Sequence, residues 1–140
     1  MFEKILLAVD GSDHALNAAT VAGNLARSEP STALRVLTVY ETVPKYLGQK
    51  EQESIIAAHM RESERILAEA RARIGKTPCA VETEVLSGPP AETIIEAALD
   101  QKADLVVMGS RGLGLLAGLL LGSQSQKVAT HAPCPVLIVR

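Results

Sequence analysis

Residues 5–12 read ILLAVDGS: five apolar residues followed by a carboxylate, a glycine and a serine. A short, continuously apolar run of strand-forming residues is typical of a strand that is covered on both faces, as in parallel sheets. After Gly11, alanines recur at spacings of three and four as far as Ala26, which predicts a helix that ends before Pro30. This opening therefore predicts a buried strand that leads directly into a helix, the first unit of an α/β fold.

The alternation of strand and helix continues to the C-terminus. Residues 81–85 alternate between uncharged and acidic side chains, so this third strand is expected at a sheet edge with one wet face. Residues 1–140 are predicted to form a single α/β domain with one five-stranded parallel sheet, of order 3-2-1-4-5, and helices on both faces. The other expected elements are strands at 34–39, 105–108 and 136–139, a helix at about 51–74, a helix after the turn at 88–90 that buries Ile94, Ile95, Ala98 and Leu99, and a helix from Ser123 to before Pro133.

Composition limits the classes of function. The 140 residues are 47% hydrophobic and 21% charged, as in an ordinary globular domain. A net charge of −2, with one Phe, two Tyr and no Trp, supplies neither the basic surface nor the stacking side chains that nucleic-acid binding needs. The longest uncharged stretch, residues 112–126, is shorter than a membrane span of about 20 residues, and the run at 5–9 is too short for a signal peptide. We therefore expect a cytoplasmic protein that neither binds nucleic acid nor spans a membrane.

The predicted strand order indicates where a ligand would bind. In the order 3-2-1-4-5 the direction of chain growth reverses between the first and fourth strands, and open α/β sheets bind ligands in the crevice at such a switch point. The residues at the carboxyl ends of these two strands are 9–12 and 108–110. The candidate site therefore lies between them.

Glycines are concentrated directly after the fourth predicted strand. Such a density is expected where backbone N–H groups approach an anion. Ser123 is predicted to cap the last helix, with Gln126 completing a capping box, and a glycine loop that leads into a helix N-terminus favours anion binding. Arg111 would add a cation; alternatively, the glycines only provide mobility. Five of the ten glycines fall within the fourteen residues 109–122: Gly109, Gly112, Gly114, Gly118 and Gly122.

The glycine spacing also carries a family resemblance. Gly109-x-x-Gly112, nine residues, then Gly122-Ser123 resembles the G-2x-G-9x-G-[S/T] signature of the nucleotide-binding branch of the universal stress protein family. Residues 5–12 and 132–139 are similar to the two ends of that family, and residues 88–94 resemble its middle turn. The resemblance implies an adenine-nucleotide alpha-hydrolase-like fold that holds ATP or a related adenine nucleotide in the crevice.

The resemblance also implies a role for individual residues. Asp10 would contact the ribose or support a magnesium ion bound with the nucleotide, although it could instead cap the following helix together with Ser12. Gln124 departs from the apolar residue expected between the two serines. The implied nucleotide-binding positions are Ala8, Val9, Asp10 and Val39 for adenine and ribose, Met108, Gly109 and Gly112 for ribose and phosphate, and Gly122, Ser123, Gln124 and Ser125, with Arg111, for the phosphates.

The function expected from these features is that of an ATP-binding regulatory protein of the stress response. One alternative is a slow ATPase or phosphotransferase, but the sequence offers only Asp10 and Arg111 and no second obvious carboxylate beside the glycines, so efficient catalysis is not expected. The three histidines share no spacing with a nucleophile, which argues against a catalytic triad.

The other alternative is a nucleotide-independent interaction module that binds an unidentified protein partner through the leucine-rich loop, Leu113 to Leu121. The last strand, Val136 to Val139, would lie at an apolar sheet edge. The family resemblance implies a homodimer formed through that edge.

Overall fold

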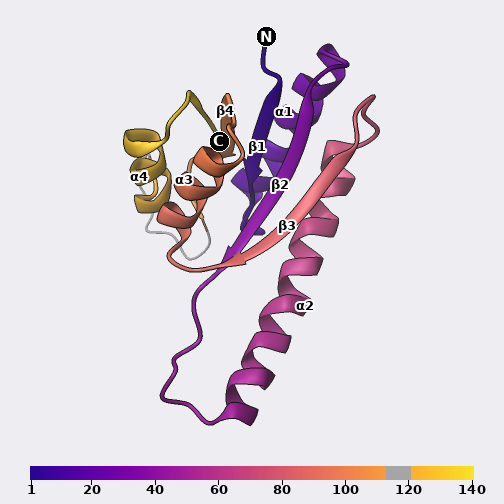
Figure 1. Cartoon of the computed structure of the whole chain (residues 1–140). Coiled ribbons are helices and arrows are strands. Elements are labelled where there is room, and N and C mark those ends of the chain that lie inside the picture. Colours follow the sequence, from indigo (N-terminus) through magenta and orange to yellow (C-terminus); the bar gives the residue numbers. More distant parts are fainter. Residues whose placement is uncertain (113–120) are drawn as a thin grey trace.

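The computed structural model describes residues 1–112 and 121–140. Strands and helices alternate along these residues, as the sequence predicts (Figure 1). Gly114, Gly118 and the leucine-rich loop up to Leu120 lie outside the described residues, so the predictions for them stay predictions. The elements are β1 (Lys4–Ala8), α1 (Asp13–Ser28), β2 (Ala33–Tyr40), α2 (Gln49–Ile74), β3 (Val81–Ser87), α3 (Pro90–Asp100), β4 (Leu105–Gly109), α4 (Ser123–His131) and β5 (Val136–Val139).

The strands form one parallel sheet in the order β3-β2-β1-β4-β5, which confirms the predicted topology. β1 is the central strand, and its Leu7 pairs with Val36 of β2 and with Val107 of β4. β3 and β5 are the two edges, as expected. The switch point therefore lies between β1 and β4, where open α/β sheets bind ligands.

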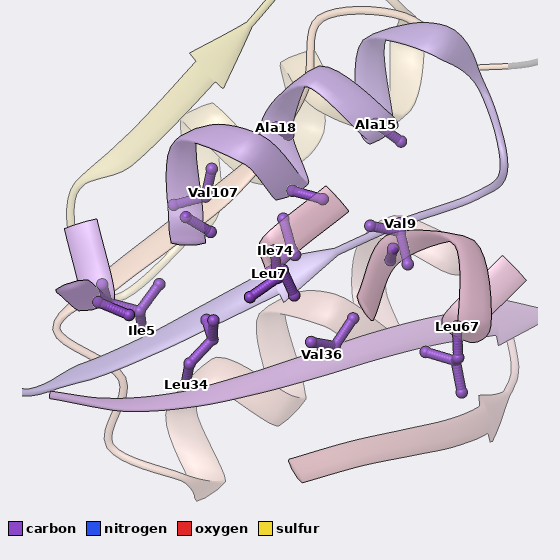
Figure 2. Packing of buried hydrophobic residues seen from close by; sticks show 14 of the residues in the cluster. Ile5, Leu7, Val9, Ala15, Ala18, Leu34, Val36, Leu67, Ile74 and Val107 are labelled. Atoms are coloured by element: carbon purple, nitrogen blue, oxygen red, sulfur yellow. The ribbon is translucent and has the colours of Figure 1, made fainter. Parts of the chain in front are cut away.

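Helices cover both faces of the sheet: α1 and α2 lie on one side, and α3 and α4 on the other (Figure 1). Successive residues of β1 point to opposite faces. Leu7 joins the apolar cluster beneath α1 and α2 (Figure 2), whereas Leu6 joins the cluster beneath α3 and α4. Both side chains are completely buried. This burial on two faces explains why the central strands are continuously apolar in sequence.

The small residues of α1 bring α2 unusually close. The alanine stripe of α1 is fully buried from Ala18 to Ala26, and Gly23 lies in the same interface. A Cβ atom on Gly23 would be 2.5 Å from the carbonyl oxygen of Ile74, so the two backbones meet without an intervening side chain. α2 ends at this crossing, where Gly75 adopts φ 74° and donates its N–H to Arg71 O.

α3 differs from the prediction in the face that it buries. Ile94 and Ala98 are buried as expected and Ile95 is half-buried, but Leu99 is 62% exposed. The prediction for Leu99 was wrong because five residues after Ile94 the helix has turned this side chain away from the sheet. None of the helices among the described residues is long and apolar enough to cross a membrane.

Candidate functional site

A cavity of about 230 Å³ lies at the carboxyl ends of β1 and β4. Every described residue that the sequence predicts as a binding position lines this cavity. These residues come from β1, β2, β4 and α4 and from the loops that adjoin them. The predicted residues that line it are Ala8, Val9, Asp10, Val39, Met108, Gly109, Arg111, Gly112, Gly122, Ser123, Gln124 and Ser125.

Four further residues line the cavity and were missed from the sequence: Ala15, Leu37, Pro90 and Ile94. Leu37 could have been found, because it lies two residues before Val39 and therefore on the same face of β2. Pro90 and Ile94 belong to the first turns of α3, which reach the crevice from another part of the chain. No local pattern in residues 88–94 signals that contact.

One part of the cavity is lined by apolar side chains. Leu37, Val39 and Met108 come from the strands, and Ile94 comes from α3 above them. Leu37, Ile94 and Met108 are themselves buried members of the cluster beneath α3 and α4, and Val39 packs against it. A slot of this kind suits a flat apolar group, such as one face of a heterocyclic ring.

The other part of the cavity leads to the start of α4. The prediction that Ser123 caps this helix in a capping box with Gln126 is wrong. Gly122 is the N-cap, with φ −68° and ψ 159° and no side-chain hydrogen bond, and its carbonyl accepts the N–H of Gln126 at 2.9 Å. Ser123 is thus the first helical residue, and its side chain is exposed. The N–H groups of this first turn have no intrahelical acceptor and carry the positive end of the helix dipole.

Ser125 and Gln124 hold neighbouring elements in place. The buried Ser125 hydroxyl donates to Gly109 O at 2.7 Å, which ties α4 to the end of β4. Because that proton is already used, only the Ser125 N–H is available to donate to a phosphate. Gln124 Oε1 accepts from Ala91 N at 3.0 Å and so caps α3, which has no side-chain cap of its own at Pro89. This bond explains a glutamine where an apolar residue was expected.

Asp10 faces the glycine loop across the crevice. Its Oδ1 accepts from Ser12 N at 2.9 Å, while a Cβ atom on Gly112 would lie 2.5 Å from Oδ2. Ser12 is the cap of α1, since its hydroxyl accepts from Ala15 N at 3.2 Å. Asp10 itself is exposed, so its carboxylate is accessible to a ligand. Within residues 1–112 and 121–140 there is no group of three or more His, Cys, Asp or Glu side chains that could hold a metal ion.

The structure also joins two residues that the sequence did not connect. His14 Nδ1 lies 2.6 Å from Ser110 Oγ, although 96 positions separate them. Ser110 is only 2% exposed and does not line the cavity. Because a nucleophile must reach its substrate, this pair is not the core of a serine-histidine catalytic site.

Comparisons with known proteins agree with the fold. The model of the universal stress protein family matches residues 1–140. The chain is 49% identical over 140 residues, the whole of both chains, to the Thermus aquaticus "Universal stress protein in QAH/OAS sulfhydrylase 3'region". The structure of universal stress protein UspA from Lactobacillus plantarum has a TM-score of 0.87 at 27% identity, covering 99% of this chain and 97% of that one. A universal stress protein solved in complex with cAMP has a TM-score of 0.72 at 27% identity, with the same coverage.

The parallel sheet and the cavity at its switch point define an open α/β domain of the kind that binds ligands at the carboxyl ends of its strands. The chain belongs to the universal stress protein family.

Proposed function

We propose that this protein is a regulatory protein of the stress response that binds ATP or a related adenine nucleotide in the cavity between β1 and β4. The observation that carries the proposal is the composition of this one cavity. A slot lined by apolar side chains, among them Val39 and Met108, leads to the Gly122 cap of α4 and its free N–H groups. An adenine nucleotide has the same two parts, a flat ring and an anionic phosphate chain. The related protein in complex with cAMP supports this assignment.

The expected mode of binding follows from the two parts of the cavity. Adenine lies in the apolar slot against Val39, and Asp10 contacts the ribose. The cavity volume of about 230 Å³ is below the range of about 300–1,000 Å³ that is usual for ligand pockets, so the phosphates extend past the glycines toward its mouth. There the N–H groups of Ser123 and Ser125 bind them, as at other helix N-termini, and Arg111 adds positive charge.

The side chains of the cavity support binding of the nucleotide without its efficient hydrolysis. Asp10 is the only acidic residue among the described residues that line the cavity. A magnesium ion would therefore bind mainly through the nucleotide phosphates, with Asp10 as its one carboxylate contact. Steady phosphate release well above that of an Asp10→Ala variant would favour the alternative, a slow ATPase or phosphotransferase.

The proposed assembly is a homodimer formed through β5. This strand is an edge of the sheet, and its Leu137 is 37% exposed. An exposed apolar edge pairs readily with a second strand, and a second copy of β5 would extend the sheet about a two-fold axis. Analytical ultracentrifugation would show a monomer if this assembly is wrong.

The first experiment identifies the ligand directly. The purified protein is denatured, any released nucleotide is identified by chromatography, and the stripped and refolded protein is titrated calorimetrically with Mg-ATP, with Mg-UTP as the control. Copurifying adenine nucleotide, or ATP binding much tighter than UTP binding, is the expected result. Absence of both release and binding would contradict the proposal and direct attention to a protein partner.

A further inference from the structure

Ser110 connects three elements immediately after β4. Its N–H donates to Val139 O of β5 at 2.7 Å, its carbonyl accepts from Gly122 N at 2.7 Å, and its hydroxyl lies 2.6 Å from His14 Nδ1 of α1. The residue is 2% exposed, so water does not compete for these bonds. Every polar group of Ser110 is therefore used to hold its surroundings together.

The bond between Ser110 and Gly122 closes the stem of the glycine loop. Gly122 is the N-cap of α4, so its position sets where the free N–H groups of this helix point. The opposite side of the stem is held by α1, because Ser12 Oγ donates to Arg111 O at 3.3 Å. The start of α1 thus contacts Ser110 and Arg111, the two residues that begin the loop.

Close backbone packing places His14 over this stem. A Cβ atom on Gly109 would lie 2.8 Å from both His14 C and Ala15 N, so the end of β4 lies directly against the first turn of α1. The His14 ring is half-buried there and contacts Ser110 without entering the nucleotide cavity. Its contact with the proposed phosphate site is therefore indirect and passes through Ser110.

We propose that His14 is a positioning residue for the phosphate-binding end of the cavity: its hydrogen bond to Ser110 holds the loop stem so that the N–H groups at the start of α4 face the nucleotide phosphates. This inference rests on the proposed function. Removing the imidazole leaves the buried Ser110 hydroxyl without its partner, and the stem must shift to satisfy it. Because phosphate binding depends on several N–H groups aimed at one point, a small shift of Gly122 weakens all of those contacts together.

Calorimetric titration with Mg-ATP tests this role in His14→Ala, His14→Asn and Ser110→Ala proteins. His14→Ala and Ser110→Ala are each expected to weaken ATP binding by about tenfold, the loss of one buried hydrogen bond. His14→Asn is expected to restore binding, because the asparagine amide reaches the position of Nδ1 and can pair with the serine hydroxyl. The double variant His14→Ala/Ser110→Ala is expected to bind ATP no more weakly than either of its single variants, since each single substitution already removes the same hydrogen bond.

Asn17→Ala is the matched control for a general loosening of α1. Asn17 lies one turn further along α1 and bonds to Arg73 Nη2 at 2.8 Å and to Arg140 O at 2.9 Å, neither of which belongs to the loop stem. It is expected to lower thermal stability while leaving ATP affinity unchanged. The inference is overturned if His14→Ala binds ATP as the wild type does, if Asn17→Ala weakens binding equally, or if His14→Asn fails to restore it. A wild-type protein that binds no ATP overturns the proposed function, and this inference with it.

Discussion

Replacing Gly122 with valine tests the anion site at the start of α4. Gly122 has φ −68° and ψ 159°, a conformation that any residue adopts, so the fold does not require a glycine here. A Cβ atom would lie 3.4 Å from Ser110 O and Arg111 Cα and 3.8 Å from Gly112 N, which is ordinary contact. In the proposed binding mode, however, the valine methyl groups would extend into the space that the phosphates occupy.

The expected losses in stability and in binding differ greatly. Valine is a poorer N-cap residue than glycine, so folding is expected to lose about 1 kcal/mol. Binding would lose at least two charge-assisted hydrogen bonds to phosphate, each contributing about 1.5 kcal/mol or more. Their sum, about 3 kcal/mol, corresponds to an affinity for ATP that is lower by about a hundredfold.

Gly48→Val is a matched control on the same chain. Gly48 is the N-cap of α2, with φ −61° and ψ 159° and likewise no side-chain cap, but it does not line the cavity. The three atoms nearest to its added Cβ all belong to the carboxylate of Glu51, an exposed side chain that can turn aside. Both variants therefore lose similar capping energy, and only one blocks the proposed site.

The assay is calorimetric titration with Mg-ATP, after thermal unfolding followed by circular dichroism has shown that both variants fold. Gly48→Val is expected to bind as the wild type does, and Gly122→Val to bind far more weakly. A folded Gly122→Val protein with the affinity of the wild type would refute the assignment of the phosphates to this helix.

Three further predictions concern stability and reactivity. Gly23→Ala should lower the free energy of unfolding in urea by about 1–3 kcal/mol, because its Cβ would meet Ile74 O at 2.5 Å; an unchanged or higher value would mean that α2 moves aside freely. Gln124→Val should cost about 1 kcal/mol in the same assay by leaving the N–H of Ala91 without its acceptor, and no loss would show that water replaces the amide. Burial raises the pKa of the Cys134 thiol, so its alkylation by iodoacetamide, followed by mass spectrometry, should increase with pH at a midpoint above that of an unstructured cysteine peptide; an equal or lower midpoint would contradict this.

Most of the fold could be predicted because its signals are local. Residues 5–9 are continuously apolar since β1 is covered on both faces, and the alanine stripe of α1 follows the helical period. The two errors also have local causes. Leu99 fits an apolar pattern but lies on the outer side of α3. Ser123 has the side chain of a typical N-cap residue, but it is the first helical residue of α4, one position after the N-cap. An apolar residue type does not by itself fix the direction of its side chain, and a capping residue type does not by itself fix the first residue of the helix.

The candidate site was predictable to the extent that it lies at strand ends. Asp10 and Gly109 follow from the sheet order alone, since the carboxyl ends of adjacent parallel strands lie side by side. The glycine spacing added Gly122, the first residue beyond the undescribed segment to line the cavity. Pro90 and Ile94 could not be predicted, because the approach of α3 to the crevice depends on packing across the sheet.

The sequence by itself determined the order of the elements, the parallel sheet and the position of the switch point. Apolar periodicity reveals each strand and helix from neighbouring residues, and the general rules for connecting them leave few possible sheet topologies. Only the tertiary structure decided which side chains meet between elements. The bond from Gln124 to Ala91 joins residues 33 positions apart, and His14 meets Ser110 across 96 positions. Such bonds require donor and acceptor to lie within about 3 Å, and that distance is set by how helices pack on the sheet rather than by any pattern along the chain.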